Sequence, residues 1–257
     1  MVENKIVLSL LAHPDDAEFL CAGTLALLRR RGWEIHIASM TPGDCGSVRH
    51  SREEISRIRR AEGANSAKLL DGQFHCLECE DLFVNYDKPT LLKAIKVLRQ
   101  VKPSVVFALG PQDYSLDHEM ASRVAQAATF GAGVPNTAIE GVSAYQPIPY
   151  LYYLDPVDGV DRLGNKITPS MAVDISGEME TKEKMLCRHE SQRNWLLVHH
   201  GLDEYVDSMK AFSRKRGQLI GVDFAEGFRQ HLGHGYPHDD ILKAELGELV
   251  HEIGRNR

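Results

Sequence analysis

The chain has 257 residues, with 30 lysines and arginines against 36 aspartates and glutamates, and a formal net charge of −6 at pH 7. A net negative charge does not favour binding to nucleic acid or to an anionic membrane. The length is sufficient for a sizeable core, and no Pro/Gly/Ser-rich linker divides it. We therefore expect a single domain over residues 1–257, in which residues 218–257 form a lid over the site or an oligomer contact.

Targeting and cysteine patterns favour the cytoplasm. Lys5 is the only cation before a short apolar run, which lacks the length and cleavage site of a signal peptide, and no stretch is long enough to cross a membrane. Five scattered cysteines are too few for a disulfide framework. Cys76 and Cys79 form a C-x-x-C pair, but a structural zinc site needs a second pair. We expect a cytoplasmic protein without membrane insertion.

Apolar runs typical of buried strands alternate with segments of helical spacing. The strand-like runs cover residues 6–11, 35–38, 104–109 and 171–173, and the helical segments cover 17–31, 52–70, 90–101, 119–129 and 178–196. This alternation predicts an α/β fold, a Rossmann-like, mainly parallel sheet with helices on both faces. Ligands bind such sheets at the carboxyl edge of the strands, where the loops 12–18, 41–47 and 110–118 begin.

The first loop packs a histidine and three carboxylates between His13 and Glu18. Repulsion among these acids would be costly without a cation, so a metal site is predicted. A catalytic zinc takes three protein ligands, and His13, Asp16 and His118 supply that set, with iron or cobalt as alternative metals. Asp15 is left over beside the ligands as a general base for water. The alternatives are that the aspartates only cap a helix and that His118 is a surface residue.

The A-H-P-D-D segment, the T-x-G-x-x-G loop at Thr41 and the Asp117-His118 pair resemble the PIG-L/LmbE-like family of zinc-dependent deacetylases. The resemblance implies zinc on the three ligands, Asp15 as general base, and hydrolysis of the N-acetyl group of an N-acetylglucosamine-type sugar or glycoconjugate. It also implies a homo-oligomer, a trimer or hexamer. Two alternatives stay open: a metal-dependent hydrolase of another amide or ester, and a non-catalytic sugar-binding relative.

The sequence departs from the family pattern at Ser115, where many members carry a histidine. Serine is a poor proton donor at neutral pH, so the acid that protonates the leaving amine must come from elsewhere. Three sources are candidates: Asp15 itself, His189, and the glycine-rich segment 231–238. A buried structural histidine explains His189 more simply, and we choose His234 in the last segment.

Asp117 and two arginines complete the predicted site. Asp117 is expected to orient a metal ligand or a neighbouring group. Arg49 and Arg52 follow the T-x-G-x-x-G loop and can bind sugar hydroxyls or an anionic aglycone, although a solvated helix start explains them equally well. Residues 131–153, rich in proline and tyrosine, predict either a pocket wall or a subunit contact.

Overall fold

The computed structural model describes residues 4–193 and 204–254. Its centre is an eight-stranded sheet with the strand order β3-β2-β1-β4-β5-β7-β6-β8. The strands are β1 (Ile6–Leu11), β2 (Glu34–Ser39), β3 (Gln73–Cys76), β4 (Val105–Ala108), β5 (Tyr150–Leu154), β6 (Met171–Asp174), β7 (Ala225–Gln230) and β8 (Val250–Glu252). β1 to β5 are parallel, whereas β7 is antiparallel to β5 and β6, and β8 is antiparallel to β6. The predicted mainly parallel α/β fold is confirmed.

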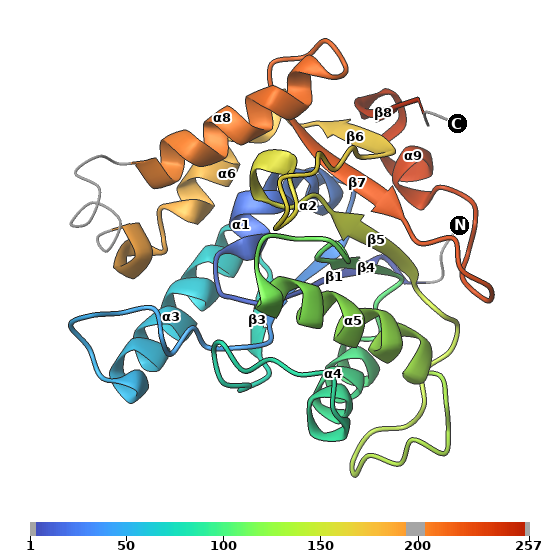
Figure 1. The fold of residues 1–257 in the computed structure, drawn as a ribbon. Coiled ribbons are helices and arrows are strands. Elements are labelled where there is room, and N and C mark those ends of the chain that lie inside the picture. The colour runs from blue at the N-terminus through green and yellow to red at the C-terminus, as the bar shows by residue number, and fades with distance from the viewer. Residues whose placement is uncertain (1–3, 194–203, 255–257) are drawn as a thin grey trace.

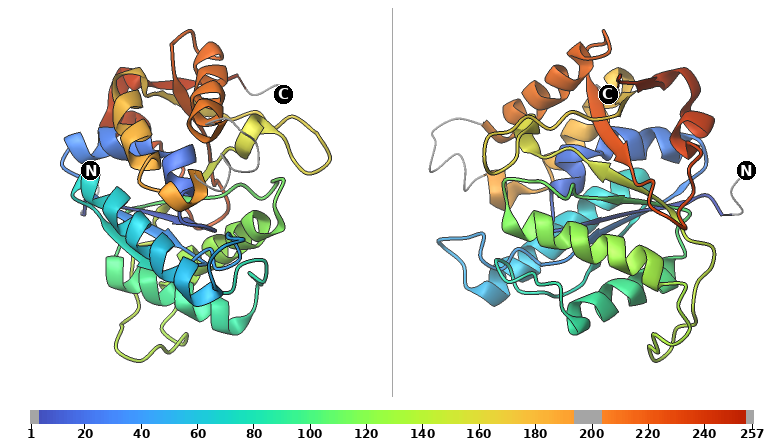
Figure 2. Two further views of the ribbon diagram at one scale, coloured as in Figure 1. Left: turned by 90° about the vertical axis from the view of Figure 1, so that its left-hand side faces the viewer. Right: turned by 45° about the vertical axis from the view of Figure 1, so that its right-hand side comes forward.

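Helices cover both faces of the sheet. They are α1 (Asp16–Leu20), α2 (Ala22–Arg30), α3 (Arg52–Ala67), α4 (Lys88–Val101), α5 (Leu116–Gly131), α6 (Met179–Leu186), α8 (Glu204–Gln218) and α9 (Ile241–Leu246). Short 3-10 turns lie at Lys68–Leu70, Val157–Gly159, Ser176–Glu178 and Gly247–Leu249. Figures 1 and 2 show α4 and α5 together on one side of the sheet, and α2, α6 and α8 on the other. Within the described residues, none of these helices has the length and apolar character needed to span a membrane.

Local sequence signals explain where these elements begin. Ser51 caps α3 by accepting a hydrogen bond from the amide of Glu54 at 3.2 Å, and Asp87 caps α4 through the amide of Thr90 at 2.9 Å. Residues 7–11 of β1 and all of β4 are buried, as is typical of central parallel strands covered on both faces. The carboxyl ends of these two strands therefore rest on a packed core and hold the following loops in place.

The helix predicted over residues 17–31 is two helices, separated at Cys21, where φ is −144°. The break lets the start of α2 face β7, where the Glu226 carboxylate accepts hydrogen bonds from the amides of Gly23 at 2.9 Å and Thr24 at 2.7 Å. An acid far along the chain thus caps this helix. The prediction of a single helix is corrected because the capping group lies outside the local sequence.

The helix predicted over residues 178–196 is also interrupted. α6 ends at Leu186, and helical geometry resumes at Glu190; residues 194–196 lie outside the described residues. Between the two, the His189 ring turns into the interior, where it is fully buried with Nε2 3.4 Å from an oxygen of Glu18. The interruption of the helix thus coincides with the residue whose ring is buried against Glu18.

The structure does not place residues 218–257 as a lid, because two strands of this segment belong to the central sheet. β7 and β8 belong to the central sheet, and β5 occupies residues 150–154 at the end of the proline-rich stretch. Because β7 is antiparallel to β5, it ends at the amino edge of the parallel strands, where the amide of His231 donates to Leu151 at 2.8 Å. The loop 231–238 therefore leaves the sheet at the edge opposite to the loops 12–18 and 110–118. An oligomer contact in residues 218–257 stays a prediction.

Candidate active site

Three predicted metal ligands converge at the carboxyl edge of the sheet. His13 follows β1 and His118 lies in the first turn of α5, with Nδ1 of His13 3.3 Å from Nε2 of His118. The Asp16 carboxylate lies 3.7 Å from His13 Nδ1 and 3.5 Å from His118 Nε2. Donor atoms of a tetrahedral site with bonds of about 2.1 Å are roughly 3.4 Å apart. The three side chains therefore fit one divalent cation.

The turn after β1 fixes the Asp16 carboxylate. Its Oδ2 accepts hydrogen bonds from the amides of Ala12 at 3.1 Å and His13 at 2.8 Å. Asp15 precedes α1 with φ 118°, a conformation that is uncommon for a residue with a side chain. Such backbone strain concentrates at functional sites, where the surrounding contacts hold it.

Each ligand histidine also faces a buried carboxylate through its other ring nitrogen. Nδ1 of His118 lies 3.0 Å from Asp113, and Nε2 of His13 lies 3.1 Å from Asp81 and 3.5 Å from Asp117. Histidines that bind metals almost always donate this second N–H to a carboxylate, carbonyl or water, which fixes the ring and its tautomer. Asp117 therefore contacts a ligand histidine, and Asp81 and Asp113 do the same without having been predicted.

The carboxylates also set the charge of the site. Burial disfavours the charged form of His13, but the hydrogen bonds that it donates to Asp117 and Asp81, together with the charge of Asp16, raise its pKa to about 10. The pKa of His118 is raised as well, in spite of burial, by the charge of Asp16 and the hydrogen bond to Asp113. A buried site with this much negative potential favours a cation. Its electrostatics thus agree with the geometry of the donor atoms.

Asp15 is held by two donors that reach the same oxygen. The hydroxyl of Tyr205, on α8, donates to Oδ2 at 2.5 Å, and Nη2 of Arg59 lies 3.3 Å from this atom. The same Nη2 donates to the carbonyl of Pro14 at 2.7 Å. Burial raises the pKa of Asp15, and the charge of Arg59 opposes that rise. Because Tyr205 and Arg59 both contact Oδ2, neither of them occupies Oδ1 of Asp15.

The T-x-G-x-x-G loop makes room for Arg59. A Cβ atom at Gly43, where φ is +69°, would overlap the Arg59 guanidinium, and one at Gly46 would lie 2.8 Å from Arg59 Nη1. Glycine at both positions lets the loop close over this arginine, which is 3% exposed. The loop therefore supports Asp15 indirectly, through Arg59.

Comparison with known proteins agrees with this arrangement. Residues 8–129 match the PIG-L family, described as GlcNAc-PI de-N-acetylase. The chain carries a PIG-L family domain. This match includes all three candidate metal ligands and Asp15, and it confirms the resemblance predicted from the sequence motifs.

Similarity continues beyond the PIG-L domain. Diacetylchitobiose deacetylase from Thermococcus kodakarensis is 26% identical over 233 residues, which cover 88% of this chain and 82% of the relative. The structure of N,N′-diacetylchitobiose deacetylase from Pyrococcus horikoshii aligns with a TM-score of 0.76 and 26% identity over 93% of this chain and 89% of that chain. A 4-oxalmesaconate hydratase from Pseudomonas putida is 26% identical over 133 residues, 49% of this chain and 52% of the relative.

The two arginines predicted for substrate binding have different surroundings. Arg52 is 2.8 Å through Nε from the Asp44 carboxylate and 3.5 Å from Glu80, so its charge is already paired. Arg49 is exposed on the loop that precedes α3. Ser115 is the residue before α5, and its amide donates to Asp113 at 3.2 Å. Ser115, which occupies the position where the family resemblance predicts a histidine, therefore lies beside the candidate site.

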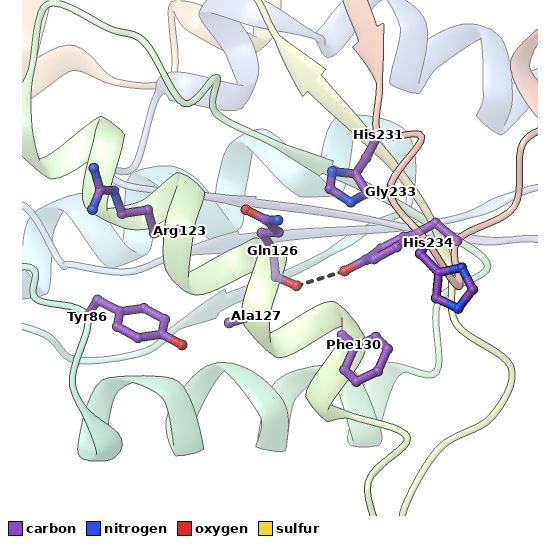
Figure 3. A pocket seen from close by; sticks show the side chains of 9 residues that line it. Tyr86, Arg123, Gln126, Ala127, Phe130, His231, Gly233 and His234 are labelled. Carbon is purple, nitrogen blue, oxygen red and sulfur yellow. Dashed lines mark hydrogen bonds between the residues drawn. The ribbon is translucent and has the colours of Figure 1, made fainter.

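His234 does not lie with the candidate metal ligands of the PIG-L domain. It lines a cavity of about 590 Å³ between α5 and the segment after β7, together with Arg123 and Phe130 (Figure 3). The antiparallel direction of β7 carries this segment to the amino edge of the sheet. The structure therefore does not bring His234 to the candidate metal ligands, where the leaving amine would need an acid.

Sequence reasoning missed several residues of this site. Asp113 lies in a predicted loop, five residues before His118, and could have been included on that ground. Tyr205 is 190 residues from Asp15 and lies on a helix outside the PIG-L match, so no local signal points to it. Tyr114 packs edge-on against the His118 ring, with centroids 5.2 Å apart, and is 55% exposed at the mouth of the site.

Proposed function

We propose that this chain is a metal-dependent N-deacetylase that hydrolyses the N-acetyl group of an N-acetylglucosamine-type sugar or glycoconjugate. The observation that carries the proposal is the convergence of His13, Asp16 and His118 at donor separations of 3.3 to 3.7 Å, beside an Asp15 carboxylate that is not needed as a ligand. Similarity to diacetylchitobiose deacetylases over most of the chain supports the substrate class.

The donor set suits zinc, with iron or cobalt as alternatives. Two imidazoles and one carboxylate are the ligands of many catalytic zinc sites, which keep a further position open. A cation bound there would polarise the acetyl carbonyl and lower the pKa of a water molecule. Asp113 and Asp81 would keep the two histidines in the tautomers that such a cation requires.

Asp15 is assigned both proton transfers. With Oδ2 held by Tyr205 and Arg59, Oδ1 accepts the proton of the attacking water as the new C–O bond forms. The same carboxyl group then gives this proton to the sugar nitrogen as the C–N bond breaks, which releases acetate and the free amine. Ser115 offers no acid at neutral pH, and His189 is fully buried against Glu18. Asp15 is thus the remaining member of the three predicted sources.

The second candidate is a hydratase. It is favoured by the 26% identity to 4-oxalmesaconate hydratase over 49% of this chain and by the serine at position 115. Addition of water to a carbon–carbon double bond needs an activated water and a base, but it has no leaving amine to protonate. The two functions therefore differ in product, since a hydratase releases no acetate.

Acetate release separates these functions. The zinc-loaded protein is incubated with N,N′-diacetylchitobiose, with methyl N-acetyl-β-D-glucosaminide, with an acetate ester of similar size, and with 4-oxalmesaconate. We expect acetate from the N-acetyl sugars, and a fall of about 10² to 10⁴ in the rate for Asp15→Asn at unchanged zinc content. Hydration of 4-oxalmesaconate without acetate release, or binding of the sugars without any hydrolysis, would reject the deacetylase.

Two expectations concern the whole protein. The resemblance to the PIG-L/LmbE-like family favours a trimer or hexamer, and the cysteine content favours the cytoplasm. Light scattering on the purified chain measures the first of these directly. A monomer at micromolar concentration would exclude the predicted oligomer.

A further inference from the structure

Exposed apolar side chains lie on the loops that carry the candidate metal ligands and on loops hydrogen-bonded to them. Five residues form this apolar rim: Leu82 (72% exposed), Phe83 (62%), Tyr114 (55%), Leu116 (67%) and Leu163 (78%). They lie in the loops that follow β3, β4 and β5 and in the first turn of α5, at the carboxyl edge of the parallel strands. Single exposed leucines are ordinary, whereas a set gathered around one site indicates a binding surface.

Hydrogen bonds join the loops of the rim to each other and to the site. The amide of Leu82 donates to Asp117 at 2.7 Å, next in sequence to Leu116. The amide of Arg162, which precedes Leu163, donates to the carbonyl of Asp113 at 3.2 Å, next in sequence to Tyr114. The three loops therefore form one connected surface.

Tyr114 and Leu82 connect this surface to the ligands. The Tyr114 ring contacts the ring of His118, with the centroids 5.2 Å apart. Leu82 has φ 70°, a left-handed conformation that is uncommon for leucine, and Asp117 holds its amide there while facing His13. The strained backbone presents an apolar side chain to solvent beside the site, which is the arrangement that folding alone would avoid.

Two arginines near the rim are paired with carboxylates. Arg162 lies 2.5 Å from Glu119, and Arg52 binds Asp44. These guanidinium groups are thus already neutralised, so this side of the mouth favours an apolar group over an anionic one.

We propose that the apolar rim binds an alkyl or aryl aglycone of the sugar substrate. This inference rests on the proposed function, because an N-acetyl group that reaches His118 places the rest of its sugar against Tyr114. The aglycone would then extend over Leu82, Leu116 and their neighbours. Sugars that carry an apolar aglycone are therefore the preferred substrates, ahead of free N-acetylglucosamine.

A series of alkyl glycosides tests the rim. The value of kcat/KM is measured for methyl, propyl, butyl and hexyl N-acetyl-β-D-glucosaminide, and should rise about two- to fourfold per methylene until the rim is covered. In Leu116→Gln and Leu82→Gln the rise should fall to less than about 1.5-fold per methylene, because the chain meets a polar side chain. Leu69→Gln is the matched control: Leu69 is 39% exposed just before β3, at the amino edge, and should keep the wild-type slope.

The outcomes separate the rim from the proposed function. Hydrolysis of the methyl glycoside with a flat dependence on alkyl length would overturn the rim and leave the deacetylase intact. Failure to hydrolyse the whole series would reject the deacetylase and the inference with it. Light scattering on the same variants tests self-association, since a Leu116→Gln variant that dissociates an oligomer and keeps the wild-type slope would assign the rim to a contact between copies.

Discussion

Histidines gather at both edges of the central sheet, but their surroundings differ. At the carboxyl edge, His13 and His118 each have a carboxylate within about 3 Å of the ring nitrogen that points away from the other histidine. At the amino edge, His231, which Figure 3 labels, pairs with the hydroxyl of Tyr153 at 2.9 Å. Its ring also packs against Tyr236, with the centroids 4.2 Å apart. Burial lowers the pKa of His231, whereas the carboxylates raise the pKa of His13 to about 10.

The comparison teaches that carboxylates, and not histidines alone, distinguish the candidate metal site. Both edges have histidines, and those at the amino edge line a cavity of about 590 Å³. Of these two edges, within residues 4–193 and 204–254, it is the carboxyl edge that has carboxylates on the ring nitrogens of its histidines, where they favour a cation. A pocket with histidines but without such charges is a poor candidate for a metal.

The largest effect is expected for His118→Ala. This change removes one of three protein ligands, so zinc content should fall below about 0.1 per chain and acetate release by more than about 10³-fold. Elemental analysis and an acetate assay on the same preparation measure both. The matched control is His231→Ala at the amino edge, which should keep its zinc. Full zinc occupancy in His118→Ala would disprove this ligand set.

A smaller effect is expected for Asp113→Asn, which keeps the shape of the side chain and removes its charge. Loss of a carboxylate behind a ligand histidine weakens metal binding by about 10- to 100-fold. Competition with a chelator measures the zinc dissociation constant. Asp81→Asn should shift it in the same direction through His13. An unchanged constant in both variants would show that these carboxylates do not orient the ligands.

Tyr205→Phe tests the support of Asp15 and should act on turnover alone. Loss of one hydrogen bond to a charged group costs about 1.5 to 3 kcal/mol, so kcat should fall roughly 10- to 100-fold. The KM value and the zinc dissociation constant should stay within about twofold, because the hydroxyl of Tyr205 binds Asp15, which is not one of the three candidate metal ligands.

The matched control for Tyr205→Phe is Tyr153→Phe, which removes a tyrosine hydroxyl that bonds to His231 at the other edge. Its kcat should match the wild type. Equal losses in both variants would point to general destabilisation in place of a role for Tyr205 in positioning the base.

The smallest effect is expected for His234→Ala. His234 is exposed at the amino edge, away from the proposed ligands, so kcat, KM and zinc content should each stay within about twofold of the wild type. Steady-state kinetics with the methyl glycoside measure the first two. A tenfold loss of kcat with full zinc would restore His234 as the acid and would require residues 231–238 to reach the site in solution.

Local patterns were enough to predict the first half of the site. The apolar run at 6–11, the turn after it and the loop 110–118 placed His13, Asp16 and His118 at one edge, because parallel strands bring their carboxyl ends together. The structure agrees with this convergence to within 3.7 Å. Such an edge can be inferred from strand direction alone.

The remaining parts depend on contacts between distant segments. β7 reads Ala-Glu-Gly-Phe-Arg-Gln and has no apolar run, because Glu226 is paired in the interior with Lys182 at 2.6 Å. Without β7 as a strand, the direction of the loop 231–238 could not be predicted. Tyr205 likewise meets Asp15 only through the packing of α8. Buried polar pairs of this kind leave no periodic signal in the sequence.

Zinc titration of the metal-free protein tests the proposed deacetylase most directly. Acetate release from N,N′-diacetylchitobiose is measured as zinc is added to the chelated wild-type chain and to His118→Ala. We expect activity that rises linearly and breaks at one zinc per chain in the wild type, with no rise in the variant. Full acetate release before zinc is added, or one zinc bound per wild-type chain without acetate release, would contradict the account.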